Sequence, residues 1–447
     1  MAFFRPAWIR FALVALAAGA LNTTPARSAD LAVDILPSPL LLAGEPFAVV
    51  IRGGVPGTEV VLETRAIDFF GDTWSARNVY LFDVAGTVDP GRQPPFEGSY
   101  EGVDALGPFW SMKRSQERLV QWGFGKYAQQ LPQFFFTRDG VNRVSLRATL
   151  SDGTSASATA EFATTARGVT QRAVSDAALV GTWVTPNLPP PWPVVVVPGG
   201  RFGYRTAQTI ALRLASQGYA TLALAFTGVE DLPPPSNAVP LEYFDGAVLW
   251  VKRQPNVAAD KVALLGIGPD AGLVLLLAAR NPTAFAAVVA ANPHSVVFPR
   301  QSGSPWTEDG RLWPHVPLAY WDDDFARTGH NYYILEKSLV LFEEAVAAAR
   351  TPVERIESPV LLLSGADDWF QPSERMAREI ADAMTDAGHG ARVRHLNYAD
   401  AGPTLNGDGI GPTTPGAVRF GGTPQGNSAA QFAAWRTVFA FLDEVLR

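Results

Sequence analysis

The chain has 447 residues and no cysteine, so disulfide bonds cannot stabilise it and thiolate metal sites are excluded. Its five histidines are scattered, without the spacing of metal ligands. A positive charge excess is also missing, since 36 Lys and Arg stand against 43 Asp and Glu, for a net charge of −7. No glycine-rich nucleotide loop occurs in a suitable context. We therefore expect no metal, no cofactor and no nucleic-acid partner.

A hydrophobic run long enough to span a membrane is missing as well. The run from Phe11 to Leu21 is too short, but it follows a basic start, MAFFRPAWIR, and precedes the small residues of NTTPARSAD. This order is typical of a secretory signal peptide. We predict a signal peptide at residues 1–29, cleaved after Ser28 or Ala29, and an exported soluble protein, periplasmic or secreted. The alternative is an N-terminal membrane anchor.

The composition is that of a compact globular protein, with 47% apolar and 18% charged residues. From residue 30 to residue 165, short alternating apolar runs are separated by turn clusters such as Gly53-Gly54 and Pro56-Gly57. Long helical patterns are absent from this half. The pattern predicts an all-β, immunoglobulin-like sandwich domain.

From residue 166 to residue 447, strand patterns alternate with helical patterns. PWPVVVVPGG predicts a buried parallel strand, TAQTIALRLASQGY a helix, and the chain closes on the helical segment SAAQFAAWRTVFAFLDEVL. Regular alternation favours an α/β domain, with a mostly parallel sheet and helices on both faces. The alternation breaks at about 292–350, which contains several tryptophans and prolines and is expected to form a cap.

The stretch LLGIGPDAGLVLLLAAR, from Leu264 to Arg280, predicts a buried strand, a tight glycine turn and an apolar helix. In α/β-hydrolases the catalytic nucleophile stands at such a turn. This turn contains no Ser, Cys or Thr. Either the nucleophile is an aspartate, or the position has lost its nucleophile.

Four segments resemble one known family, in the same order along the chain. They are TWSARNVYLFDVAGTVDPGRQPPFEGSYEGVDALGPFWSM, ASQGYATLALAFTGVEDLPPP, LEYFDGAVLWVKRQPNV and PVERIESPVLLLSGADDWFQPS. The chain resembles the acyl-CoA thioesterases and bile acid-CoA:amino acid N-acyltransferases over nearly all of its expected mature length. The resemblance implies a β-sandwich joined to an α/β-hydrolase domain, a triad of Ser or Cys, Asp and His, and an acyl thioester substrate.

The resemblance also assigns the catalytic positions. Aligned without gaps, the nucleophile position is Gly268, which has no side chain, and the next residue, Pro269, has no N–H for an oxyanion hole. The base position falls on Pro403 in NYADAGPTLN. The acid position falls on Asp367 in SGADDWFQPS, with Asp368 as its usual companion. Asp367 is thus a retained acid, or a residue that only binds loop amides.

Asp270 permits two interpretations. A shift of two residues fits GPDAG to the pattern G-x-D-x-G, with Asp270 as a carboxylate nucleophile. In the other interpretation Asp270 lies in the first turn of the helix, where the dipole favours its charge. The loop PGGRFGYR supplies Gly199, Gly200 and Gly203, whose N–H groups either form the other half of an oxyanion hole or belong to a tight turn only.

None of the histidines follows the last strand, where the resemblance expects the base. The five are His294, His315, His330, His389 and His395. His395 lies inside the last strand, and His294 follows the preceding sheet strand. An aspartate nucleophile would therefore lack a base to activate water for release of its ester intermediate.

These changes favour a non-catalytic function, because loss of a triad Ser or His alone costs roughly a millionfold in rate in a protease. We predict an exported relative of the thioesterases that binds an acyl or other hydrophobic small molecule, or a protein partner. One alternative is an active thioester or ester hydrolase, or an acyltransferase, that uses Asp270 or another unusual nucleophile. Another is a structural module whose cleft has collapsed.

Overall fold

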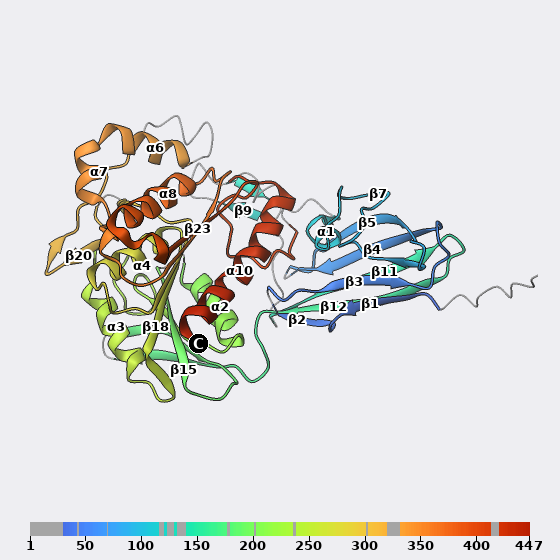
Figure 1. Cartoon of the computed structure of the whole chain (residues 1–447), viewed down its shortest axis with the longest axis horizontal. Coiled ribbons are helices and arrows are strands. Elements are labelled where there is room, and N and C mark those ends of the chain that lie inside the picture. The colour runs from blue at the N-terminus through green and yellow to red at the C-terminus, as the bar shows by residue number, and fades with distance from the viewer. Residues whose placement is uncertain are drawn as a thin grey trace, which may run out of the picture.

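The structure is a computed structural model in which the N-terminal part is rich in strands and the C-terminal part combines strands and helices (Figure 1). The expected signal peptide at 1–29 lies outside the described residues. The structure describes residues 30–42, 44–68, 70–115, 120–122, 129–131, 140–176, 179–200, 203–235, 238–300, 303–319, 331–412 and 420–447.

The N-terminal part contains a three-stranded sheet, β1-β3-β6, and a seven-stranded sheet, β2-β12-β11-β4-β5-β7, in which β8 also pairs with β5. Its pairs are antiparallel except β2 with β12, and β9 and β10 form a separate hairpin. The strands are β1 Ala32–Leu36, β2 Leu40–Leu42, β3 Ala48–Arg52, β4 Glu59–Ile67, β5 Thr73–Leu81, β6 Thr87–Val88, β7 Glu97–Gly98, β8 Lys113–Arg114, β9 Val120–Trp122, β10 Gln129–Leu131, β11 Val141–Leu150 and β12 Ser155–Ala163.

Alternation along the strands builds the core of this part. In β4 the side chains of Val60, Leu62 and Ala66 are buried, while the residues between them face outward or lie partly covered. The short helix α1, Gly107–Trp110, adds Phe109 to the same core. The predicted β-sandwich character follows from this inward and outward alternation.

The C-terminal part is built on an eight-stranded sheet of order β13-β14-β16-β15-β18-β19-β22-β23. From β16 to β23 the strands are parallel, whereas β13 and β14 are antiparallel at one edge and were not singled out from the sequence. The strands are β13 Thr170–Asp176, β14 Leu179–Thr185, β15 Trp192–Gly199, β16 Ala220–Ala225, β18 Val257–Ile267, β19 Ala287–Ala291, β22 Val360–Gly365 and β23 Val393–Tyr398.

Helices cover both faces of this sheet, because its central strands are apolar on both sides. In β15, Val194 and Val196 face one layer, and Val195 and Val197 face the other. The first layer is formed by α3 Glu242–Lys252, α4 Pro269–Arg280 and α8 Ser373–Met384, and the second by α2 Tyr204–Ser216 and α10 Pro424–Leu446. The predicted α/β-hydrolase-like fold class is confirmed.

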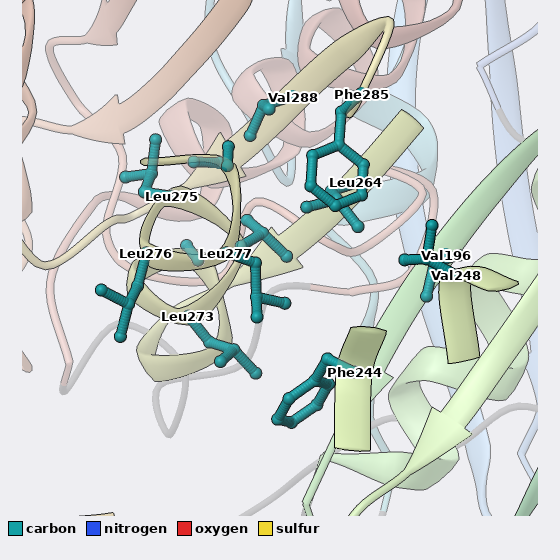
Figure 2. Packing of buried hydrophobic residues seen from close by; sticks show 14 of the residues in the cluster. Val196, Phe244, Val248, Leu264, Leu273, Leu275, Leu276, Leu277, Phe285 and Val288 are labelled. Atoms are coloured by element: carbon teal, nitrogen blue, oxygen red, sulfur yellow. The ribbon is translucent and has the colours of Figure 1, made fainter. Parts of the chain in front are cut away.

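Helix α4 is the most deeply buried helix of the first layer. The side chains of Leu273, Leu275, Leu276 and Leu277 point in different directions around the helix axis, and all four lie in the apolar core (Figure 2). Its only charged residues are Asp270 in the first turn and Arg280 in the last. An apolar helix of this kind holds the turn before it rigidly against the sheet.

The predicted cap at 292–350 contributes elements that lie outside the sheet, with α6 and α7 at one extremity of the molecule (Figure 1). Residues 301–302 and 320–330 of this segment lie outside the described part. The further elements of the C-terminal part are β17 Val239–Pro240, β20 Trp306–Glu308, β21 Arg311–Leu312, α6 Tyr332–Leu341, α7 Glu343–Ala349 and the short turns η2 Val353–Arg355, η3 Thr385–His389 and η4 Gly390–Arg392.

The two parts share packing. Ile410, which follows the last sheet strand, is 5% exposed and belongs to the sandwich core. Phe432 of α10 packs against the same core, and Gln425 at the start of α10 donates to Asp104 at 3.2 Å. The sandwich is thus seated on the loop and helix that follow β23.

Candidate functional site

The turn between β18 and α4 has the geometry of a nucleophile elbow. β18 ends at Ile267, α4 begins at Pro269, and Gly268 between them has φ 60° and ψ −127°, a conformation that side-chain-bearing residues rarely adopt. Its N–H donates to the carbonyl of Ala291 at 2.8 Å, which ties the turn to the neighbouring strand. A Cβ at Gly266 would collide with the backbone oxygen of Asp270, so strand and helix meet as closely as glycine permits.

The tip of this elbow carries no reactive group. A Cβ added at Gly268 would meet no heavy atom of the described residues within 4 Å. Pro269, at the first position of α4, has no N–H to donate into that space. The positive φ belongs to Gly268, while Asp270 is the second residue of the helix.

The Asp270 carboxylate is directed toward the loop after β15. Its Oδ2 would lie 3.0 Å from a Cβ added at Gly203, the residue that precedes α2. Burial raises the pKa of Asp270 to about 6, against the opposing effects of Arg300 and the Gly200 N–H. A carboxylate of the protein itself therefore lies beside the loop that was predicted to contribute to an oxyanion hole.

The predicted oxyanion loop begins where β15 ends. A Cβ at Gly199 would lie 2.8 Å from the Cα of Tyr204, so the loop turns back directly onto the start of α2. The N–H groups of Gly203 and Tyr204 both donate to the carbonyl of Gly200, at 2.8 and 2.7 Å. Arg201 and Phe202 lie outside the described residues.

Asp367 follows β22 at the same edge of the sheet. Its Oδ1 accepts the indole N–H of Trp369 at 2.6 Å, and its Oδ2 accepts the N–H of Gly422 at 2.8 Å. Both carboxylate oxygens are thus engaged without a histidine. Asp367 contacts Gly422, in the loop that follows the base position. In a catalytic triad the acid likewise lies next to the base.

The neighbouring Asp368 is buried and has different partners. Its Oδ1 accepts the N–H groups of Phe370 and Gln371 at 2.9 and 3.1 Å, and its Oδ2 lies 2.7 Å from the hydroxyl of Ser373. Burial raises the pKa of Asp368 to about 7. Asp368 closes the turn before α8.

Pro403 lies beside the end of β19, the strand next to β18. Its carbonyl accepts the side-chain N–H of Asn292 at 2.6 Å, and the N–H of Gly402 donates to Asn427 at 2.8 Å. Asn292 directly follows β19, so the loop after β23 does return across the carboxyl edge of the sheet. The residue there is a proline, which offers neither a proton nor a proton acceptor from its side chain.

The described histidines have other surroundings. His294 is buried, its Nε2 lies 2.8 Å from Gln371 Oε1, and burial lowers its pKa to about 4. His389 Nδ1 lies 2.7 Å from the carbonyl oxygen of Ile356. His315 is partly exposed, and His330 lies outside the described residues.

One histidine does meet a serine. His395 Nε2 lies 2.7 Å from Ser364 Oγ, a contact that the sequence did not predict. Ser364 has no exposed surface, and its hydroxyl donates to Asn397 at 2.8 Å, so it has no second proton for the imidazole to remove. The pair shares its sheet face with Leu362, which packs in the layer of α8. It presents no accessible nucleophile.

Arg300 belongs to the same site, although no pattern in the sequence singled it out. Its guanidinium lies over the rings of Phe226 and Trp306, at 4.7 and 5.2 Å from their centroids, and its Nη2 lies 3.8 Å from Asp270 Oδ1. Burial lowers the pKa of Arg300, while Asp270 opposes that effect. Only the fold brings this residue to the first turn of α4.

A cavity of about 310 Å³ lies beside α8, close to the acid loop. Its lining is largely polar and charged, from Tyr332, Asp368, Glu374, Arg378 and Asp382 among others. Within the described ranges, no group of His, Cys, Asp and Glu is arranged to hold a metal ion. No helix in these ranges has both the length and the apolar composition to cross a bilayer.

Two family descriptions match the chain. The model described as "Acyl-CoA thioester hydrolase/BAAT N-terminal region" matches residues 44–176, and the one described as "BAAT / Acyl-CoA thioester hydrolase C terminal" matches residues 239–447. Together they span most of the chain. The protein belongs to the acyl-CoA thioester hydrolase and BAAT family.

Relatives in this family are similar over almost their whole length. The mitochondrial acyl-coenzyme A thioesterase 2 of Rattus norvegicus is 28% identical over 90% of this chain and 86% of its own. The bile acid-CoA:amino acid N-acyltransferase of Mus musculus is 27% identical over 91% of this chain and 96% of its own. The peroxisomal succinyl-coenzyme A thioesterase of Mus musculus is 26% identical, over 90% and 94%.

Among solved structures, a dienelactone hydrolase-like phosphotriesterase from metagenomic libraries is similar to part of this chain. It shares 19% sequence identity, with a TM-score of 0.39, over 62% of this chain and 99% of that chain.

Proposed function

We propose that this member of the thioester hydrolase and BAAT family is non-catalytic and holds an acyl-type small molecule at the carboxyl edge of its eight-stranded sheet. The observation that carries this proposal is the elbow tip. Gly268 offers no nucleophile, and Pro269 offers no oxyanion N–H. Acyl transfer at this position would lack both its attacking atom and one of its donors.

The other catalytic positions support the proposal. Both oxygens of Asp367 are bound by Trp369 and Gly422, and the base position holds Pro403. A triad works as a unit, so loss of the nucleophile and the base together leaves the acid without a task in catalysis. In this proposal Asp367 fastens the loop after β23.

We propose ligand binding rather than a structural module with a collapsed cleft. The names of the relatives include acyl-coenzyme A, succinyl-coenzyme A and bile acid-CoA, which all carry an acyl group. We further propose that the chain is exported through the signal sequence predicted at 1–29. Because acyl-CoA is a cytosolic metabolite, the ligand of an exported relative is a free acyl compound rather than a CoA thioester.

Hydrolysis assays test this proposal. The full chain is incubated with activated esters and acyl thioesters, alongside Asp270→Asn and Asp367→Asn variants and the exposed control Asp386→Asn. We expect no turnover above buffer for any of the four proteins. Turnover by the wild type that is lost in Asp270→Asn or Asp367→Asn, but kept in Asp386→Asn, would overturn the non-catalytic proposal.

A further inference from the structure

The outer face of the seven-stranded sheet carries a groove of about 900 Å³, remote in sequence from the catalytic positions. Its walls come from β4, β5, β7, β8 and β11 and from the residues around β8, and β11, β4, β5 and β7 lie side by side in the N-terminal part (Figure 1). Cations outnumber acids in its lining, although the chain as a whole is acidic. The cations are Arg65, Arg77, Lys113 and Arg147, and the acids are Glu63 and Glu97.

Four strands place two of these cations on either side of a serine. The register sets four residues opposite one another on β11, β4, β5 and β8, namely Ser145, Arg65, Ser75 and Lys113. All four are exposed, so they share the outer face of the sheet. Because neighbouring strands lie about 5 Å apart, the Cα atoms of Arg65 and Lys113 are about 10 Å apart, with only the short side chain of Ser75 between them.

The residue after Lys113 fixes the direction in which Lys113 points. Arg114 forms an ion pair with Asp72 and lies over the ring of Trp74, 5.7 Å from its centroid. Trp74 belongs to the sandwich core, so β8 turns Arg114 inward. Since successive residues of a strand face opposite sides, Lys113 faces outward and lines the groove.

The charges of Arg65 and Lys113 are not balanced by a neighbouring acid. Arg65 donates to the hydroxyl of Thr73 at 3.3 Å, which is a neutral partner. Among the described residues, neither Arg65 nor Lys113 takes part in an ion pair. This row therefore offers two positive charges and the Ser75 hydroxyl, all reachable from the groove.

The neighbouring row differs because it contains an acid. There Glu63 stands directly between Arg147 and Arg77 in the register of the three strands. Arg147 also donates to the hydroxyl of Ser155 at 3.2 Å. An anion over this row would meet the negative charge of Glu63, so the row of Arg65 is the more favourable position for one.

We infer that this groove binds a small organic phosphate, whose phosphate group lies over Ser75 between Arg65 and Lys113. A phosphate monoester carries up to two negative charges and three terminal oxygens, which match two cations and a hydroxyl. The three donors come from three strands, so they approach from different directions and suit a tetrahedral group better than a planar carboxylate. The inference is independent of the proposed function, because every residue that lines the groove belongs to the N-terminal part.

Calorimetric titration of the full chain at low salt tests the inference. The probes are inorganic phosphate and glucose 6-phosphate, with glucose and acetate for comparison. We expect both phosphates to bind, glucose not to bind, and acetate to bind at least about fivefold more weakly than glucose 6-phosphate. Because the cations are exposed, added sodium chloride should weaken the binding of both phosphates.

Two variants locate the binding. Arg65→Gln and Lys113→Gln should each weaken the binding of glucose 6-phosphate about fivefold to tenfold, because each removes one charged donor. Both positions are exposed, so the variants should fold like the wild type, which thermal unfolding checks. The control Arg143→Gln removes the same charge from the same face of β11, outside the groove, where Arg143 pairs with Glu161 at 3.1 Å. This control should bind glucose 6-phosphate like the wild type.

Four results would overturn the inference. They are no binding of either phosphate, unchanged affinity for glucose 6-phosphate in both Arg65→Gln and Lys113→Gln, an equal loss in Arg143→Gln, and acetate binding as tight as that of glucose 6-phosphate. None of these results bears on the non-catalytic proposal, which depends on Gly268 and Pro269 and is tested by the hydrolysis assays.

Discussion

At the scale of single residues, Asp367 and Asp368 show how adjacent carboxyls acquire different properties. Asp367 accepts hydrogen bonds from the indole of Trp369 and from the backbone N–H of Gly422, which lies in the loop after β23. Asp368 faces inward, is 4% exposed, and has a pKa raised by burial to about 7. Its hydrogen bonds, with two N–H groups donating to Oδ1 and the Ser373 hydroxyl donating to Oδ2, oppose this rise, so burial is the larger effect.

This difference predicts a pH-dependent stability. The folded-state pKa of Asp368 lies above the ordinary value of 3.8, so its stabilising contribution is complete below about pH 4 and is lost as the pH rises through about 7. Asp368→Asn, an isostere of the neutral acid, should match the wild type near pH 4. It should then become relatively more stable by about 1 kcal/mol per pH unit until about pH 7.

Urea unfolding of wild type and Asp368→Asn between about pH 4 and about pH 8 measures this difference in unfolding free energy. Asp386→Asn, at an exposed position after α8, serves as the control and should follow the wild type throughout. Parallel curves for wild type and Asp368→Asn would show that folding does not raise the pKa of the Asp368 carboxyl.

At the scale of elements, the elbow between β18 and α4 keeps its shape although its tip is a glycine. The close approach at Gly266 and the hydrogen bond from Gly268 to Ala291 hold strand and helix together, and α4 is buried on nearly all sides. Packing and this backbone hydrogen bond therefore hold the shape of the turn.

A pair of glycine variants tests this packing. Gly266→Ala places a Cβ against the backbone oxygen of Asp270 and should destabilise the protein by about 1–3 kcal/mol or more, as overpacking does. Gly246→Ala, in the middle of α3 with open space around it, should be neutral or stabilising by up to about 1 kcal/mol. Thermal unfolding followed by circular dichroism separates the two. Equal stabilities would mean that the turn tolerates an extra methyl group.

At the scale of the whole molecule, the two parts are linked through the segment that follows β23. That segment accepts a hydrogen bond from Asn292 at Pro403 and inserts Ile410 into the sandwich core. Arg213 of α2 donates to the carbonyls of Asn406 and Gly407 between these points, at 3.1 and 3.2 Å. The same loop therefore borders the site and connects the two halves.

Ile410→Ala should weaken this connection. Removal of a buried isoleucine side chain costs about 2–5 kcal/mol of unfolding free energy, and Ile410 anchors the segment after β23 in the sandwich core. We expect a lower unfolding midpoint and a broader or biphasic urea transition, because the sandwich and the α/β part become less coupled. The control Leu312→Ala, 66% exposed, should leave the transition unchanged. A single sharp transition with an unaltered midpoint in Ile410→Ala would show that the link contributes little.

The sequence alone determined the order and type of most elements. The valine run of β15, the apolar helix α4 and the alternation of β4 are local patterns, and local patterns report burial and secondary structure directly. The four quoted segments were sufficient to indicate the family, which the comparisons confirm. Strands β13 and β14 were not found, because they form an antiparallel pair that precedes the regular alternation of strand and helix.

The tertiary structure decided how the side chains meet. Arg300, Phe226 and Asp270 come from three segments far apart in the chain, and no periodicity relates them. The contacts of Asp367 with Gly422 and of His395 with Ser364 likewise depend on which way each side chain points. Sequence patterns report which face of an element is buried, whereas the pairing of polar groups between distant segments arises only when the chain has packed.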